Sequence, residues 1–277
     1  MTRKALLFII VLSLLVSAGC ATKSAAKKSD ELAVNEKGEK LQYVDTPTGR
    51  WLIHDMEREK PEIITPGTAS TQDQAGTAPS DATWLFDGTD DSLKKYWKPT
   101  KWICRDGYME SVKGAGYIET AQNYGSCQLH VEFATPTPPK GTSQGRGNSG
   151  VFLQGEYEIQ VLDSYENITY ADGQCAALYG RSVPEVNVCR PPAQWQTYDI
   201  IYYRPIFKGK DVVRKPRFIV LQNGVLVQDT PLEGGTNWQG PHAISDFRPL
   251  PDAGPIMLQD HGNPVRYRNI WIRPFKD

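Results

Sequence analysis

The sequence lacks an excess of charge of either sign. Lys and Arg number 31 against 32 Asp and Glu, so the formal net charge of the 277 residues is -1. Without a general electrostatic field to attract polyanions, binding to nucleic acid is not expected. No long window has helical periodicity either, and the 24 Gly and 20 Pro favour short strands joined by turns over a helical bundle. Aromatic residues, at 10%, are too abundant for a disordered chain.

A long apolar run is also missing, except at the N-terminus. There, Arg3 and Lys4 precede the apolar residues 5–16, which is the pattern of a secretory signal and is shorter than the roughly 20 residues of a membrane span. The segment ends in Ser17-Ala18-Gly19-Cys20, which resembles a bacterial lipobox, although leucine is commoner than serine at its first position. We therefore expect acylation of Cys20 and an outer-membrane lipoprotein that faces the periplasm or the cell surface. The alternative is an ordinary cleaved signal peptide, and either would occupy residues 1–19.

Export changes what the other four cysteines are expected to do, because thiols in an oxidising compartment tend to pair. Two disulfides are possible, in three connectivities. We expect Cys175 to pair with Cys189, since they flank a short stretch with loop residues, and hence Cys104 with Cys127. Free buried thiols are the alternative. A zinc site is disfavoured because no Cys-x-x-Cys spacing occurs.

The mature chain divides by composition into a polar N-terminal part, residues 20–81, and a folded part, residues 82–277. Residues 21–40 are rich in Lys, Ala, Ser and Glu and predict a flexible tether. Residues 41–67 hold several large apolar side chains, and Trp51 to Asp55 are expected to lie against the main domain as an extended arm. The small, polar residues 68–81 are predicted to be a linker. The rest fits one domain of sandwich size.

Period-two runs bounded by turn residues recur throughout residues 82–277. Asn223-Gly224 between two apolar runs is a strong signal for a two-residue hairpin, and Asp106-Gly107 is similar. Further strands are expected at residues 117–120, 127–133, 150–153, 157–162, 197–203, 256–259 and 267–272. The sequence therefore predicts an all-β fold, an antiparallel two-sheet jelly-roll sandwich.

Two of these strands carry polar side chains at alternate positions. On one of them, Glu158 and Gln160 alternate with apolar residues that belong in the core. On another, His130 and Glu132 alternate with apolar neighbours in the same way. If these polar faces line the concave side of a curved sheet, they form a groove suited to sugars; otherwise they are the solvated side of a sheet. We expect a functional position for Glu158 and Gln160 and a solvated one for His130.

Several blocks of the sequence resemble the bacterial 3-keto-disaccharide hydrolase domain family. Together they span residues 82–277 in order, and the extension around Trp51 to Asp55 is similar too. The blocks are Trp84-Leu85-Phe86-Asp87-Gly88, Gly147-Asn148-Ser149-Gly150-Val151-Phe152-Leu153, residues 157–164 (YEIQVLDS), residues 187–199, Leu258-Gln259-Asp260-His261-Gly262 and Arg268-Asn269-Ile270-Trp271.

The resemblance implies a concanavalin-like or glucanase-like sandwich that acts on glycosides whose C3 hydroxyl has been oxidised to a ketone. A C3 carbonyl acidifies the hydrogen on C2, so that a base can remove it and the resulting enolate can expel the C1 substituent. Addition of water then completes net hydrolysis. Such a site needs a base near C2, stabilisation of the enolate oxygen and a proton donor for the leaving group. The resemblance also suggests a divalent metal ion, such as calcium or manganese, and no organic cofactor.

Glu158 is the first candidate for the base or a metal ligand, because it is a carboxylate on a rigid strand. His261 is the second, since imidazole titrates near neutral pH and a loop after a predicted strand presents it. The predicted contacts with substrate involve two groups of residues. Asn148, Ser149, Gln160 and Asn269 are expected to bind sugar hydroxyls, and Arg146 or Arg268 is expected to stabilise the enolate. Asn148 could instead shape a turn, Arg268 could pair with an acid, and Asp163 could cap a strand.

Two other functions compete with this one. A retaining glucanase would carry two carboxylates about 5 Å apart, whereas Gln160 cannot titrate and Asp163 is predicted to point away from Glu158. A noncatalytic sugar-binding module would depend on aromatic platforms, for which Trp195, Trp238 and Tyr165 are candidates. A purely structural surface lipoprotein is also possible, but it explains none of the polar faces.

Overall fold

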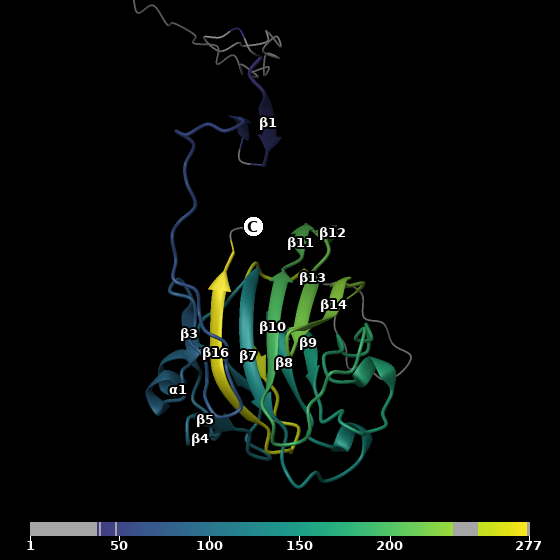
Figure 1. The fold of residues 1–277 in the computed structure, drawn as a ribbon. Helices are drawn as coiled ribbons and strands as arrows, with labels where there is room; N and C mark the ends of the chain where they lie inside the picture. Colours follow the sequence, from purple (N-terminus) through teal and green to yellow (C-terminus); the bar gives the residue numbers. More distant parts are fainter. Residues whose placement is uncertain (1–37, 39, 48, 235–248, 276–277) are drawn as a thin grey trace, which may run out of the picture. The chain divides into compact units, whose positions relative to one another are not determined.

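The computed structural model describes residues 38, 40–47, 49–234 and 249–275, and the chain divides into two units at Glu62/Ile63 (Figure 1). The first unit contains an antiparallel hairpin of β1 (Tyr43–Thr46) and β2 (Gly49–Leu52). The predicted contact of Trp51 to Asp55 with the main domain stays a prediction. Cys20 and the expected signal lie outside the described residues. Within the described part, no helix is long and apolar enough to span a membrane.

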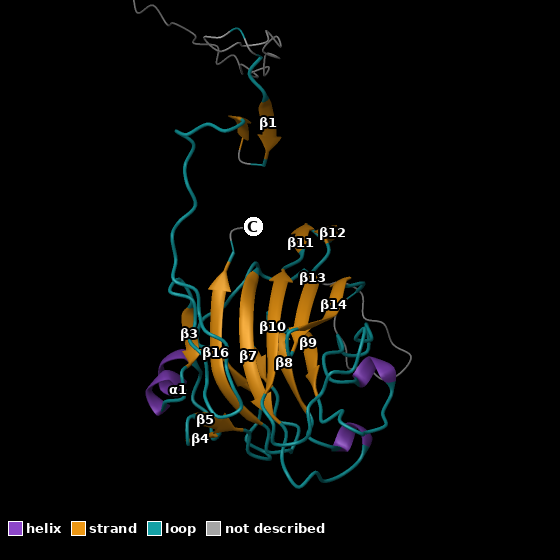
Figure 2. Ribbon diagram, viewed as in Figure 1, coloured by secondary structure: helices purple, strands orange, loops and turns teal. Residues whose placement is uncertain are grey.

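The second unit is a sandwich of two antiparallel sheets, which confirms the predicted fold class (Figure 2). The larger sheet has eight strands in the order β14-β13-β10-β7-β16-β5-β4, and β3 pairs with β16 beside this path. The smaller sheet has the order β6-β15-β8-β9. The larger sheet comprises β3 (Thr83–Phe86), β4 (Ile103–Arg105), β5 (Tyr108–Glu110), β7 (Cys127–Ala134), β10 (Gln196–Tyr203), β13 (Arg217–Gln222), β14 (Val225–Pro231) and β16 (Arg266–Pro274). The smaller sheet comprises β6 (Ile118–Glu119), β8 (Ser149–Leu153), β9 (Tyr157–Val161) and β15 (Met257–Leu258).

Short elements complete the unit. The helix α1 (Asp90–Tyr96) begins where the Thr89 side chain accepts a hydrogen bond from the Ser92 N–H. Two 3-10 turns (Ser143–Gly145 and Ala171–Gly173) lie in loops, and β11 (Ile206–Lys208) pairs with β12 (Asp211–Arg214). Both predicted hairpins are present. Asn223 and Gly224 have φ values of 53° and 82° between β13 and β14, as a two-residue turn requires.

The core fills the space between the two sheets. On β7, Leu129, Val131 and Phe133 are fully buried, and on β9 the alternate residues Tyr157, Ile159 and Val161 are likewise buried. Aromatic pairs link the sheets, with ring centroids 5.6 Å apart for Tyr157 and Phe218 and 5.9 Å apart for Tyr157 and Tyr202. Because side chains alternate along a strand, the polar residues of β7 and β9 lie on opposite outer faces of the sandwich.

The alternative in which these two polar faces share one groove is therefore excluded. Alternation was predicted correctly on each strand, but the strands belong to different sheets. Glu158 and Gln160 lie on the outer face of the smaller sheet. His130 and Glu132 lie on the outer face of the larger sheet.

Residues 68–77, predicted to be part of a linker, instead form a loop on the outer face of the larger sheet, which we call the strap (Figure 1). Hydrogen bonds between Thr68 and Thr77 close the loop. Arg268 of β16 donates a hydrogen bond to the Thr71 carbonyl (2.5 Å), and the Ser70 hydroxyl donates to Glu132 of β7. The compact unit thus begins at Ile63, not at residue 82.

The four cysteines are free thiols in this structure, so the two predicted disulfides are absent. The pairing of Cys104 with Cys127 is wrong because β5 and β16 separate β4 from β7. Cys175 and Cys189 do lie near each other, since the Gln222 amide contacts both sulfurs, at 3.5 and 3.3 Å. Their predicted closeness is therefore correct, but both are thiols in the structure.

Candidate active site

Glu158 lies on the outer face of β9, directly opposite Phe152 of β8. Its carboxyl group lies over Gly150, where a Cβ atom would be only 2.4 Å from Oε1. The residue is 8% exposed, and within the described part of the chain its carboxyl group has no hydrogen bond or ion pair. Burial without a compensating partner raises the pKa of Glu158 to about 8. The group therefore binds a proton much more strongly than an ordinary carboxylate.

Two glutamine side chains flank Gly150 on the same face. Gln160 of β9 is the register partner of Gly150, and the Gln259 N–H donates to the Gly150 carbonyl from the other side (3.0 Å). The Gln160 amide nitrogen donates to Gln144 Oε1 (2.8 Å), and that of Gln259 donates to the Tyr117 hydroxyl (2.7 Å). The side-chain oxygens of Gln160 and Gln259 are buried and accept no hydrogen bond. We call Glu158, Gln160 and Gln259 the row above Gly150. Each of the three side chains has an oxygen atom that accepts no hydrogen bond within the described part of the chain.

Loops beside β9 hold this row in place. Gln144 donates to the Thr169 hydroxyl (2.8 Å) and to the Gly173 carbonyl (2.9 Å). Asn148 donates to the Gln144 carbonyl (2.7 Å), so the predicted binding residue Asn148 supports Gln160 through Gln144. Sequence reasoning missed Gln144, which stands in no recognisable pattern. It also missed Tyr117 and Gln259, although Gln259 belongs to one of the blocks that carry the family resemblance.

Aromatic rings stand on both sides of Glu158. Tyr117 and Phe152 have ring centroids 5.7 Å apart, and Tyr170 and Tyr179 form a second pair at 6.3 Å. Burial raises the pKa of both Tyr117 and Tyr170, and the charge of Glu158 adds to both shifts. The backbone places one member of each pair next to Glu158, since Phe152 is its register partner on β8 and the Tyr179 N–H donates to the Glu158 carbonyl (3.2 Å). Apolar rings around a few convergent polar groups are typical of small-molecule binding sites.

His261, the second predicted catalytic residue, is exposed in the loop that follows Gln259. Asp260 shapes this loop by accepting hydrogen bonds from the Gly116 N–H (3.1 Å) and the Gly262 N–H (2.8 Å). Among the described residues, the His261 ring has no hydrogen bond or ion pair. Its predicted role toward Glu158 therefore stays a prediction.

Two further predicted substrate-binding residues have structural partners instead. Arg146 forms an ion pair with Asp163 (2.6 Å) and donates to the Tyr165 carbonyl (2.6 Å). Its guanidinium group therefore binds the loop after β9. Ser149 is fully buried, where its hydroxyl donates to the Gln259 carbonyl (2.6 Å). The prediction for Ser149 is wrong because alternation along β8 turns Gly150 outward and Ser149 into the core.

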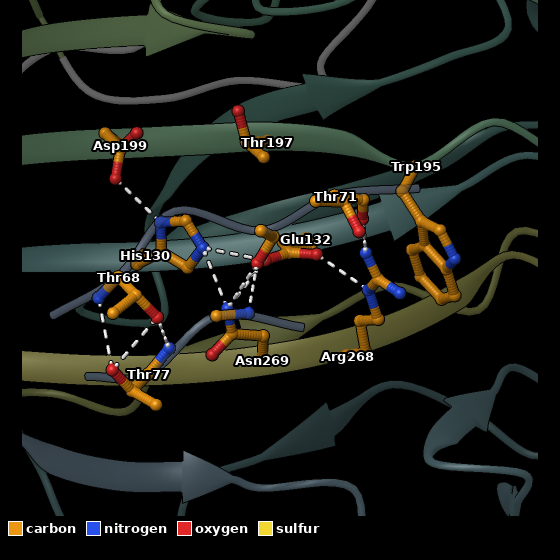
Figure 3. Close-up of polar contacts among 12 residues, drawn as sticks. Thr68, Thr71, Thr77, His130, Glu132, Trp195, Thr197, Asp199, Arg268 and Asn269 are labelled. Carbon is orange, nitrogen blue, oxygen red and sulfur yellow. Dashed lines mark hydrogen bonds and ion pairs between the residues drawn. The ribbon is translucent and has the colours of Figure 1, made fainter. Parts of the chain in front are cut away.

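Arg268 and Asn269 lie on the other side of the sandwich, so their predicted contact with this site is wrong (Figure 3). A bulge in β16 between Arg268 and Trp271, with Asn269 at φ 49°, lets both side chains reach Glu132. Arg268 Nε donates to Glu132 Oε2 (2.7 Å), and Asn269 Nδ2 donates to Glu132 Oε1 (2.6 Å). The Ser70 hydroxyl from the strap completes this cluster.

His130 belongs to the same cluster and is buried, not solvated as expected (Figure 3). It bonds to Asp199 through Nδ1 (2.7 Å) and to Glu132 through Nε2 (3.2 Å), and its ring stacks on Trp271. Burial opposes the charged form, but hydrogen bonds to the two carboxylates outweigh it and raise the pKa of His130 to about 9. For Glu132, burial is likewise outweighed by hydrogen bonds from His130 and Ser70, among others, so its pKa is lowered. The cluster is thus a charged anchor for the strap.

A divalent metal site built on Glu158 and His261 does not fit the residues present. No group of three or more His, Cys, Asp or Glu side chains in the described ranges could hold a metal ion. Glu158 is the one ionisable member of the row above Gly150. Gln160 and Gln259 add only neutral oxygens. We therefore derive no step of a reaction through a metal ion.

Comparisons with known proteins agree with this architecture. The family described as 3-keto-alpha-glucoside-1,2-lyase-like domain matches residues 81–273. The crystal structure of a candidate glycosyl hydrolase from Parabacteroides distasonis ATCC 8503, at 2.13 Å resolution, is 39% identical, with a TM-score of 0.75. That match covers 88% of this chain and 100% of the other.

A second candidate glycosyl hydrolase of the same organism, solved at 1.70 Å, is 20% identical with a TM-score of 0.51, and shows the likeness of fold alone. The match covers 71% of this chain and 94% of the other. No curated protein matches the chain. From the family match over residues 81–273 and the 39% identity to a solved relative, the chain belongs to the family of 3-keto-alpha-glucoside-1,2-lyase-like domains.

Proposed function

We propose that this protein cleaves glycosides whose C3 hydroxyl has been oxidised to a ketone, with Glu158 as the base that removes the C2 proton. The observation that carries the proposal is the environment of Glu158. Its carboxyl group is buried, has no partner in the described part of the chain, and has its pKa raised to about 8. A base with a pKa near the working pH is the most efficient kind, because it is both available and strong.

The reaction proceeds in two stages. Ionised Glu158 takes the proton from C2, and the C2–H electron pair forms an enolate whose charge rests on the C3 oxygen. Collapse of the enolate forms the C1–C2 double bond and breaks the bond from C1 to the aglycone oxygen, which takes up a proton. Addition of water to C1 and C2 of the unsaturated sugar then gives net hydrolysis.

Tyr117 is our candidate for the proton donor. Its hydroxyl oxygen already accepts the hydrogen bond from Gln259, so its own O–H is left to donate to the enolate oxygen or to the leaving group. It is also close enough to Glu158 for the carboxylate charge to raise its pKa. Arg146, one of the two cations predicted to stabilise the enolate, is instead bound to Asp163.

Direct hydrolysis of an unoxidised sugar fits the site less well. A retaining glycosidase needs a second carboxyl group about 5 Å from the first. Asp163 is buried and paired with Arg146, and the intervening outward residue is Gln160. A noncatalytic sugar-binding module is also less well supported, because Trp195 lies beside Arg268 at the larger sheet (Figure 3). Trp238 lies outside the described residues.

The test is to incubate the purified protein with a 3-keto-glucoside and with the unoxidised glucoside, each with and without a chelator. We expect release of the aglycone from the ketone alone, and release that does not depend on the chelator. Release from neither substrate would reject the enzymatic proposal. Equal release from both would reject the requirement for the ketone, and loss with the chelator would restore a metal to the reaction.

Gly150→Ala should abolish most of this cleavage without unfolding the protein. The added Cβ would lie 2.4 Å from Glu158 Oε1 and 3.0 Å from a Phe152 ring carbon, so the carboxyl group must leave its position. Misplacing a reacting group by about 1 Å costs on the order of 100-fold in rate. Gly145→Ala is the matched control, since nothing lies within 4 Å of its added Cβ. Equal kcat values for the two variants would contradict the placement of Glu158.

We also propose, from sequence alone, that the enzyme is exported and anchored to the outer membrane through acylated Cys20. That segment lies outside the described residues.

A further inference from the structure

We propose that Gln160 and Gln259 act as a pair that selects substrates by their ring hydroxyls, and that Gln259 is a specificity-determining residue of the site. The ligand class is a pyranoside that keeps two hydroxyl donors on the part of the ring lying above Gly150. The inference rests on the proposed function, because it concerns the same site.

The two free oxygens of the pair are costly for the folded protein. The side-chain oxygens of Gln160 and Gln259 are both buried and accept no hydrogen bond. Leaving such a buried acceptor without a partner is destabilising, and native proteins contain few of them. Two such acceptors lie in one row, on either side of a glycine, next to an unpartnered carboxyl group. A ligand that brings O–H donors would satisfy both.

The orientation of the Gln160 amide is fixed by its partners. The Gln160 amide nitrogen contacts Gln144 Oε1 at 2.8 Å and the Gly173 carbonyl at 3.5 Å, and both partners are acceptors. Rotating the amide by 180° would place Gln160 Oε1 next to two acceptor oxygens, which repel it. Gln160 Oε1 therefore stays on the opposite side, away from Gln144 and Gly173. Gln144 is itself fixed by its bonds to Thr169 and Gly173. On the other side, the Gln259 nitrogen donates to the Tyr117 hydroxyl (2.7 Å).

The spacing of the two glutamines suits a single sugar ring. Gln160 and Gln259 lie on either side of the β8 residue Gly150, so two inter-strand steps, about 10 Å in all, separate their backbones. The absent side chain at Gly150 makes room for the Glu158 carboxyl group, whose Oε1 lies 2.4 Å from where a Cβ atom would be. A pyranose ring that lies over the three side chains would present hydroxyls to both glutamines and its edge to Glu158.

The experiment compares three substrates, namely a 3-keto-glucoside and its 4-deoxy and 6-deoxy analogues. All keep the ketone, the C2 hydrogen and the leaving group, so the chemistry is unchanged. For the wild type we expect kcat/KM to fall roughly 10- to 100-fold with at least one analogue, because a buried acceptor then stays unsatisfied. In Gln259→Met, discrimination against that analogue should shrink to within about 3-fold.

Controls separate specificity from general damage. Gln194→Met changes an exposed glutamine of another loop and should keep the wild-type ratio of substrates. Gln259→Glu keeps an acceptor oxygen and should retain discrimination, even where its overall rate falls. Thermal unfolding of each variant checks that it is folded. Equal cleavage of all three substrates by the wild type, or an equal loss on all three in Gln259→Met, would overturn the proposal.

A binding measurement keeps this inference separate from the proposed reaction. Calorimetry with the unoxidised glucoside and its deoxy analogues needs no turnover, so it reports the hydroxyl contacts even if no ketone is cleaved. Weaker binding of a deoxy analogue to the wild type but not to Gln259→Met would support the pair. Calcium or manganese binding to the sugar-free protein that is lost in Gln259→Met would overturn it in favour of a cation site.

Discussion

Glu158→Gln is expected to lose cleavage of the 3-keto-glucoside by roughly 100- to 10,000-fold, the usual contribution of a general base. Glutamine keeps the size of the side chain but cannot accept the C2 proton. In the wild type, kcat/KM should rise with pH and level off above about 8, where Glu158 is ionised. A rate that falls above pH 8 would mean that Glu158 acts as an acid instead of a base.

The same substitution should stabilise the folded protein at alkaline pH. The pKa of Glu158 is about 8 in the folded chain against an ordinary value of 4.5, so the folded state binds the proton more tightly. Its contribution to the free energy of unfolding therefore falls as the pH rises from 4.5 to about 8. At about 1.4 kcal/mol for each pKa unit, the full loss is about 5 kcal/mol.

Urea denaturation at pH 5 and pH 9 measures this effect. Wild type and Glu158→Gln should have nearly the same stability at pH 5, and the variant should be the more stable one at pH 9. Glu166→Gln, at an exposed position in a nearby loop, is the control and should follow the wild type at both pH values. If the free energy of unfolding changed equally with pH for the wild type and Glu158→Gln, the Glu158 carboxyl group would have to be either exposed or paired.

The second large effect is expected for Glu132→Gln, which should destabilise the protein by about 3–5 kcal/mol. Glu132 is fully buried and bonds to Arg268, Asn269, His130 and Ser70 (Figure 3). Removing its charge leaves the buried guanidinium of Arg268 without its carboxylate. The strap should then detach more easily, and limited proteolysis within residues 68–77 should become faster.

The control for this variant is Asp199→Asn. Its side chain is 38% exposed, so water can replace part of its ion pair with His130, and the loss of stability should be smaller than for Glu132→Gln. The pKa of His130 is raised from 6.5 to about 9, so the charged ring stabilises the fold fully below pH 6.5, and this stabilisation is lost as the pH rises through 9. Equal stabilities for the two variants, or an unchanged cleavage rate within the strap, would contradict an anchoring role for Glu132.

Local signals were enough to predict the strands, the hairpins and the outward position of Glu158. The turn at Asn223-Gly224 and the alternation along β9 depend only on neighbouring residues, which is why both were correct. What sequence could not show is which sheet each strand joins. His130 was placed correctly on the polar side of its strand, but that side belongs to the larger sheet and lies under the strap.

Other predictions failed for the same reason, because they depend on contacts between residues far apart in the sequence. Arg268 and Asn269 stand beside motif residues in the sequence, yet a bulge in β16 directs both to Glu132. The role of Gln259 depends on its alignment with Gly150, which is more than a hundred residues away in the chain. No pattern within one segment contains that information.

The strap also determines where the N-terminus of a truncated protein can be placed. The family match begins at residue 81, which makes a truncation just before that position an obvious choice for producing the domain alone. Such a truncation removes Ser70 and the backbone carbonyl of Thr71, and it exposes Glu132 and Arg268 to water on one side. The compact unit that includes these contacts starts at Ile63, so residues 63–80 should be retained whenever the domain is expressed, crystallised or fused to another protein.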